Sequence, residues 1–233
     1  MKKFVIANWK ANKSLQEAHA WLAEIKNSTS QLDLAKVEPI VAPAFTLLAA
    51  IQDEVSGLGW QLGAQSISPF PAGSYTGAVS AHNLQGLGIS YVIVGHSERR
   101  QYFQETDQMV AQKVEQVLEL GAMPVVCVNE QTVSSQAAAL GESLASRCMV
   151  AYEPRDAIGS GDNASLEDVK QFGAQVKQLF GAVPYLYGGS VDETNIGEYM
   201  LVTDGAVVGT AALDAGQFSR LLLAAQGVSP AAL

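Results

Sequence analysis

The sequence predicts a single α/β domain folded as a closed (β/α)8 barrel. Eight short apolar segments, rich in residues that favour pleated structure, punctuate the chain at regular intervals. Each of them is followed by a segment with helical periodicity or helix-start signals. No Pro-rich, Gly/Ser-rich or single-sign charged run divides the 233 residues, so residues 1–233 are expected to form one domain.

The predicted strands cover residues 4–7, 39–42, 60–64, 91–94, 123–128, 149–152, 185–187 and 205–208. Strands that alternate with helices imply a parallel sheet, because a parallel neighbour needs a crossover connection. Eight such units in a chain of 233 residues fit a closed barrel. The alternative is an open doubly wound sheet, but no Gly-x-Gly-x-x-Gly follows the first strand and no Gly-Lys-Ser/Thr loop occurs.

Helices are predicted from capping boxes and from apolar stripes. Ser14 and Ser165 each begin a capping box, with Glu17 and Asp168 at the third helical position. The predicted helices cover residues 15–26, 47–53, 81–87, 110–118, 135–146, 166–179, 194–200 and 217–226. The chain is shorter than a typical barrel, and we expect the shortening in the outer ring, between the fifth and sixth strands and around the seventh.

Composition narrows the functional classes. The formal net charge of −9 argues against nucleic acid as a partner, since phosphate backbones attract basic surfaces. Cys127 and Cys148 each lie in an apolar run, which favours buried free thiols over a disulfide or a metal site. The first residues lack the apolar stretch of a signal peptide, and no apolar run approaches 18 residues. We therefore expect a soluble cytoplasmic protein without membrane contact.

Polar side chains follow several predicted strands directly. Glu153 ends the sixth strand, and Pro154 stops the ladder after it because proline has no N–H to donate. A lone acid before proline is usually a solvated strand end. Likewise, Lys10 alone would be a surface lysine, and His96 alone would be a satisfied histidine. What favours function is that these groups recur together at the strand ends.

The carboxyl ends of barrel strands converge on one face, where chemistry takes place. They bring a cation, an imidazole and a carboxylate together with two Gly-containing turns that lead into helices and can bind phosphate through N–H groups. A carboxylate facing a neutral imidazole suits proton abstraction next to a carbonyl. The residues concerned are Asn8, Lys10, His96, Glu98, Glu153, Ser190 and Gly209.

The residues around these strand ends resemble the triosephosphate isomerase family, whose fold is the TIM barrel. The similar motifs occur in family order at the ends of strands 1, 4, 6 and 7, and the resemblance spans essentially the whole chain. They are Asn8-Trp9-Lys10-Ala11-Asn12, Gly95-His96-Ser97-Glu98-Arg99-Arg100, Ala151-Tyr152-Glu153-Pro154 with Ile158-Gly159-Ser160-Gly161, and Tyr187-Gly188-Gly189-Ser190-Val191.

The resemblance implies an isomerase of glycolysis and gluconeogenesis that interconverts dihydroxyacetone phosphate and glyceraldehyde 3-phosphate. Glu153 would be the catalytic base, and His96 the neutral electrophile in front of a helix. Lys10 would hold the substrate and offset its charge, with Asn8 beside it and Glu98 orienting it.

The phosphate would be held largely by backbone N–H groups. The resemblance places Gly159, on a closing loop of residues 154–161, together with Ser190, Gly209 and Thr210 in this role. It implies no metal and no organic cofactor. Two other functions stay open from the residues: a non-catalytic barrel that binds a phosphorylated ligand, and an enzyme acting on another phosphorylated sugar.

Three departures from the family pattern bear on the site and on assembly. Arg155-Asp156 replaces a Val-Trp hinge, and we expect Arg155 to pair with Glu130 or Asp156. Thr210 replaces a second glycine, which would cost strain if that position needs a positive φ. The long loop from Ser66 to Ser80 resembles the family's dimerisation loop but has Ala78 in place of an acid, and we still expect a homodimer.

Overall fold

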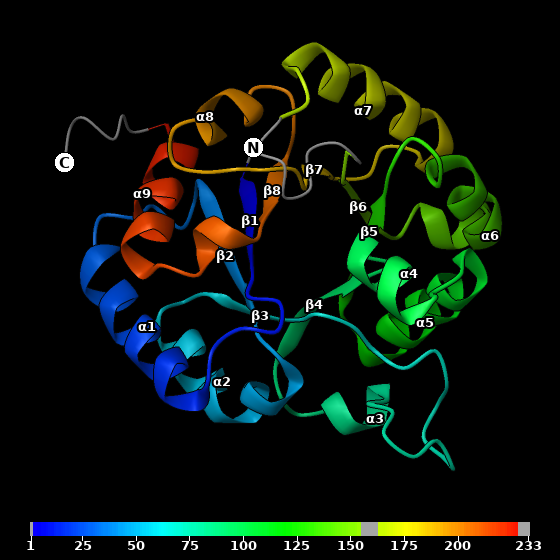
Figure 1. Ribbon diagram of the computed structural model, residues 1–233, viewed down its shortest axis with the longest axis horizontal. Coiled ribbons are helices and arrows are strands. Elements are labelled where there is room, and N and C mark those ends of the chain that lie inside the picture. The colour runs from blue at the N-terminus through cyan, green and yellow to red at the C-terminus, as the bar shows by residue number, and fades with distance from the viewer. Residues whose placement is uncertain (1, 155–162, 228–233) are drawn as a thin grey trace.

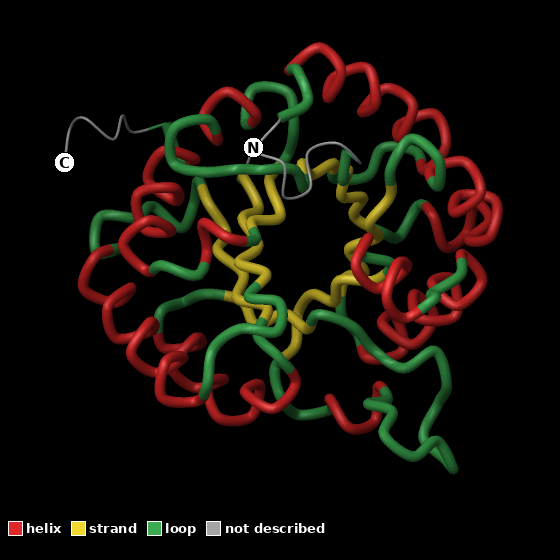
Figure 2. Tube along the Cα trace, viewed as in Figure 1, coloured by secondary structure: helices red, strands yellow, loops and turns green. Residues whose placement is uncertain are grey.

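The computed structural model describes residues 2–154 and 163–227 as a closed barrel of parallel strands inside a ring of helices (Figure 1). Figure 2 shows the strands as a continuous inner ring with helices outside it. The strands are β1 (Lys3–Asn8), β2 (Val37–Ala42), β3 (Gln61–Ala64), β4 (Ile89–Val94), β5 (Met123–Val128), β6 (Met149–Tyr152), β7 (Tyr185–Tyr187) and β8 (Gly205–Val208). The predicted (β/α)8 fold is confirmed.

The helices of the described residues are α1 (Leu15–Ser28), α2 (Leu48–Gly57), α3 (Ala81–Leu84), α4 (Ser97–Phe103), α5 (Asp107–Leu120), α6 (Val133–Ala145), α7 (Leu166–Phe180), α8 (Ile196–Tyr199) and α9 (Ala215–Ala225), with the 3₁₀ turns η1 (Phe45–Leu47) and η3 (Thr210–Ala212). None of these helices is long and apolar enough to cross a membrane.

Alternation along the strands divides the core into two layers. In β1, Ile6 points into the barrel, where it meets residues such as Ile40 and Val207. Its neighbours Val5 and Ala7 face the helices instead, in the layer that contains Trp21 and Phe218. Successive side chains of a strand point to opposite faces, so each barrel strand is covered on both sides.

The cap predicted at Ser14 is confirmed in full, with the reciprocal bonds of a capping box to Glu17. Ser165 caps α7 by accepting from the N–H of Asp168 at 3.1 Å. One helix, α4, follows no predicted stripe. None of its side chains is buried, so no apolar periodicity marks it in the sequence.

Candidate active site

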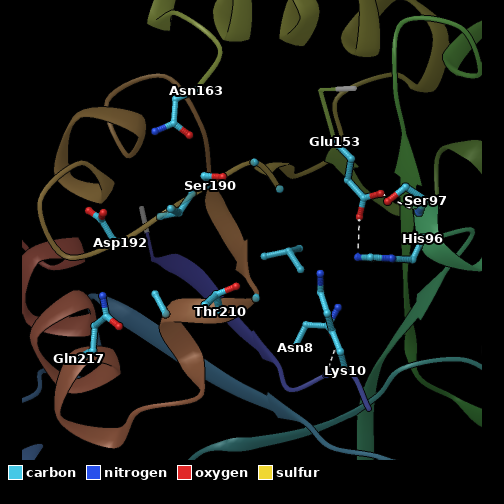
Figure 3. A pocket seen from close by; sticks show the side chains of 16 residues that line it. Asn8, Lys10, His96, Ser97, Glu153, Asn163, Ser190, Asp192, Thr210 and Gln217 are labelled. Carbon is cyan, nitrogen blue, oxygen red and sulfur yellow. Dashed lines mark hydrogen bonds and ion pairs between the residues drawn. The ribbon is translucent and has the colours of Figure 1, made fainter. Parts of the chain in front are cut away.

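A pocket with a volume of about 310 Å³ opens at the carboxyl end of the barrel (Figure 3). Its walls come from the ends of β1, β4, β6, β7 and β8 and from the first turn of α9. The structure brings together most of the residues singled out in the sequence: Asn8, Lys10, His96, Glu153, Ser190, Gly209 and Thr210 all line the pocket. Gly159 and the Arg155-Asp156 hinge lie outside the described residues.

The carboxylate of Glu153 is buried, with 3% of the residue exposed, and it is held from two sides. Its Oε2 accepts a hydrogen bond of 2.8 Å from the backbone N–H of Ser97. Its Oε1 lies 3.2 Å from Nε2 of His96. Gly188 makes room for it, because a Cβ at that position would lie 3.1 Å from Cγ of Glu153. The acid that ends β6 is therefore a pocket residue and not a solvated strand end.

His96 is the N-cap of α4, and its hydrogen bonds assign the neutral tautomer. Nδ1 accepts from the backbone N–H of Glu98 at 3.3 Å. A neutral imidazole that accepts at one nitrogen carries its proton on the other. The proton thus lies on Nε2, which is the atom that faces Glu153. A donor in this position can polarise a carbonyl group in the pocket.

Lys10 occupies the left-handed region, with φ of 51°, which is uncommon for a residue with a side chain. The surrounding contacts impose this conformation. Its N–H donates to Oδ1 of Asn8 at 3.1 Å, and its carbonyl accepts from the amide of Gln65 at 2.9 Å. Its ammonium Nζ lies 2.7 Å from Oε1 of Glu98. Strained backbone of this kind is characteristic of functional sites.

Glu98 does not line the pocket, yet it contacts two residues that do. One carboxylate oxygen holds Lys10, and the other lies 3.7 Å from Nδ1 of His96. Glu98 thus contacts Lys10 and His96 from outside the pocket lining, and its orienting role stays a prediction.

At the end of β8, Gly209 lies close to the side chain of Lys10. A Cβ at Gly209 would lie 3.3 Å from Cε of Lys10. Gly209 itself has φ of −92°, and Thr210 begins η3 without a positive φ. The replacement of a second glycine by Thr210 therefore brings no backbone strain, and the N–H remains in the pocket wall.

Four polar residues of the pocket lining were missed in the sequence reasoning. Ser97 lies inside a quoted motif, but its N–H bond to Glu153 spans 56 positions and leaves no local signal. Asn163, Asp192 and Gln217 carry no motif, and they reach the pocket only because the barrel closes (Figure 3). Asp192 is already engaged, since its Oδ1 accepts from the hydroxyl of Thr194 at 2.6 Å and from the N–H groups of Thr194 and Asn195.

Glu130, which was expected to meet Arg155, accepts a hydrogen bond from the hydroxyl of Tyr152. Because Arg155 lies outside the described residues, the expected pair stays a prediction. Within residues 2–154 and 163–227, no group of three or more His, Cys, Asp or Glu side chains is placed to hold a metal ion.

Comparison with known proteins identifies the family. The sequence profile described as triosephosphate isomerase matches residues 3–225. A triosephosphate isomerase of Endomicrobium trichonymphae is 35% identical, over 95% of this chain and 98% of its own length. One from Idiomarina loihiensis is 36% identical, over 96% and 98%, and one from Rubrobacter xylanophilus is 37% identical, over 97% and 98%. Similarity of this extent, on a closed barrel with these strand-end residues, shows that the chain belongs to the triosephosphate isomerase family and is an isomerase.

Proposed function

We propose that this chain interconverts dihydroxyacetone phosphate and D-glyceraldehyde 3-phosphate by proton transfer through an enediolate, a reaction of glycolysis and gluconeogenesis. The observation that carries the proposal is the placement of Glu153 and His96, whose Oε1 and Nε2 atoms lie 3.2 Å apart beside Lys10 in one pocket. Family membership supports the same reaction.

In the proposed mechanism Glu153 is the base. Its carboxylate removes the proton from the hydroxyl-bearing carbon next to the ketone, and the electron pair moves toward the carbonyl oxygen. The N–H at Nε2 of His96 and the ammonium of Lys10 stabilise the negative charge that develops on that oxygen. The proton of the substrate's hydroxyl group then moves to the oxygen of the former ketone, and Glu153 returns its proton to the neighbouring carbon. The product is the aldehyde, and no atom is gained or lost.

The phosphate end of the substrate is assigned to the opposite wall of the pocket. Ser190, Gly209 and Thr210 lie there, at the ends of β7 and β8. Backbone N–H groups at such turns bind anions without a cationic side chain. This suits a chain whose formal net charge is −9, because the local donors and not the overall charge would attract the substrate. Gly159 is proposed to add a further N–H.

The test is a coupled isomerase assay on the purified protein, with Glu153→Gln and the control Glu54→Gln measured in parallel. Glu54 is an exposed acid on α2 that contacts His19 and lies outside the pocket. We expect activity in the wild type and in Glu54→Gln, and its collapse in Glu153→Gln. An inactive wild type that still binds a phosphorylated enediolate mimic would instead identify a phospho-ligand-binding barrel.

The protein is also proposed to be a homodimer through the loop of residues 66–80. Figures 1 and 2 show this loop extending away from the barrel between β3 and α3. At its tip Phe70 and Tyr75 stack at 4.6 Å and are 42% and 43% exposed. Its base is anchored, since Nζ of Lys113 donates to Oγ of Ser66 at 2.8 Å. Exposed aromatic rings on an ordered projection favour burial against a partner.

Light scattering at micromolar concentration tests the dimer. We expect a dimeric mass for the wild type and a monomeric mass for the double variant Phe70→Ser/Tyr75→Ser. Leu201→Ser, at another exposed apolar residue (81% exposed), is the matched control and should stay dimeric. A monomeric wild type would refute the proposal. We further propose that residues 1–233 form one domain and that the protein is located in the cytoplasm. Fractionation of the source cells would test the location.

A further inference from the structure

Two stacked tyrosines hold Ala164, which lies just before the start of α7. Ala164 donates its N–H to the hydroxyl of Tyr187 at 3.1 Å, and its carbonyl accepts from the hydroxyl of Tyr199 at 2.8 Å. The two rings stack with centroids 4.2 Å apart. Tyr187 ends β7, whereas Tyr199 ends the short helix α8. Both polar groups of one residue are thus fixed by side chains from two other elements.

The two hydroxyl groups therefore hold Ala164 from both sides, one accepting from its N–H and the other donating to its carbonyl oxygen. Burial raises the pKa of both hydroxyl groups, so both keep their protons at neutral pH.

The bonds to Ala164 connect the phosphate end of the pocket to Asn163. Tyr187 directly precedes Gly188-Gly189-Ser190, and Asn163 directly precedes Ala164. Asn163 and Ser190 both line the pocket, and Figure 3 places them in the same part of it as Asp192. Fixing the backbone of Ala164 therefore fixes how far Asn163 reaches toward the turn that is assigned to phosphate.

We propose that Tyr199 is a positioning residue for the isomerase reaction, which acts through Tyr187 and Ala164 to hold Asn163 at the phosphate wall of the pocket. The inference rests on the proposed function and adds to it a residue that lies outside the pocket lining. Tyr199 touches neither Glu153 nor His96, so it affects binding of the phosphate more than the proton-transfer step.

The variant Tyr199→Phe keeps the ring stack and removes only the hydroxyl. A net hydrogen bond is worth about 0.5–1.5 kcal/mol, so we expect KM for the triose phosphate to rise about 2- to 10-fold while kcat changes less than twofold. The inhibition constant of inorganic phosphate should rise by the same factor. Tyr185→Phe is the matched control, because its hydroxyl donates a similar 2.9 Å bond to the carbonyl of Val169, away from the pocket.

A double-mutant cycle with Asn163→Ala tests the route of the effect. If Tyr199 acts through Asn163, Tyr199→Phe should no longer raise KM once Asn163 is truncated. An additive rise in the double variant would overturn the route. KM and phosphate inhibition within twofold of wild type in Tyr199→Phe, alongside a loss of melting temperature like that of Tyr185→Phe, would overturn the inference and leave a purely structural role. An inactive wild type would instead reject the proposed function, while phosphate binding by the variants would still test Tyr199.

Discussion

Oε1 of Glu153 lies 3.2 Å from Nε2 of His96, although the two residues stand 57 positions apart in the chain. The contact depends on two neighbours of His96. The N–H of Ser97 fixes the other carboxylate oxygen, and the N–H of Glu98 fixes the tautomer of the ring. The start of α4 thus sets both the place of the carboxylate and the protonation of the imidazole.

This arrangement predicts a steep cost for shortening the acid. Glu153→Asp withdraws the carboxylate by one methylene group, away from Ser97 and His96. We expect kcat to fall by about 10²-fold or more, because general-base catalysis depends on reach within the pocket. Steady-state kinetics measure the loss, and thermal unfolding checks that the fold is intact. A variant with kcat within a factor of three of wild type would contradict the role of Glu153.

The backbone conformation of Lys10 predicts that a side chain required for activity lowers the stability of the fold. Its φ of 51° strains any residue that has a Cβ, whereas glycine adopts it freely. Lys10→Ala and Lys10→Gly should both lose activity, because both remove the ammonium group. We expect Lys10→Gly to be the more stable of the two by about 0.5–1 kcal/mol, after allowing for the greater entropy of glycine in the unfolded state. Urea unfolding of the two variants measures the difference, and the opposite order would show that the strain is absent.

Replacing Gly189 by a residue with a Cβ is predicted to destabilise the fold, because Tyr187 lies against it. A Cβ at Gly189 would lie 2.2 Å from the hydroxyl of Tyr187, so that buried ring would have to move. We expect Gly189→Ala to destabilise the fold by about 1–3 kcal/mol and to weaken phosphate inhibition. Gly197→Ala, on α8, is the control, because a Cβ there would meet only the carbonyl oxygen of Ala224 at 4.0 Å. The unfolding free energy of this control should be unchanged or should rise by up to about 1 kcal/mol. Equal effects of the two variants would exclude the clash.

The fold could be predicted from the sequence because each barrel strand is buried on both faces. Runs such as residues 91–94 and 205–208 are therefore apolar throughout, and they stand out between Gly and polar punctuation. Helices with a buried stripe, such as α5 and α7, were found for the same reason. No apolar stripe marks α4, because it buries no side chain, and only the family resemblance placed a helix after His96. A periodic pattern exists only where one face of an element is covered.

The site could be predicted only as far as its motifs reach. Glu153 and His96 were found because strand ends and family motifs mark them. Asn163 and Gln217 carry no such mark, since their place in the pocket depends on how the chain closes around the end of β8. The absence of backbone strain at Thr210 also could not be predicted from the sequence, because only the structure shows that this position does not have a positive φ.

Alkaline pH should destabilise the protein through groups that the fold keeps protonated. Burial raises the pKa of the Cys148 thiol from 9.0 to about 12, and burial together with the carboxylate of Glu153 raises that of Cys127 well above 9.0. Below about pH 9 the thiols are protonated in both the folded and the unfolded chain, so the unfolding free energy keeps its full value. As the pH rises from 9 toward 12, the unfolded chain loses protons that the folded chain retains, and the unfolding free energy falls.

Each such group contributes a slope of up to about 1.4 kcal/mol per pH unit above its unfolded pKa. We expect Cys148→Ala to flatten the fall in unfolding free energy between pH 9 and 10.5, whatever it costs in packing at pH 7. Urea unfolding under reducing conditions at several pH values measures the slope. His19→Gln is the control, since His19 lies exposed on α1 and pairs with an exposed acid of α2. An unchanged slope in Cys148→Ala would mean that the thiol ionises as readily in the folded chain as in the unfolded one.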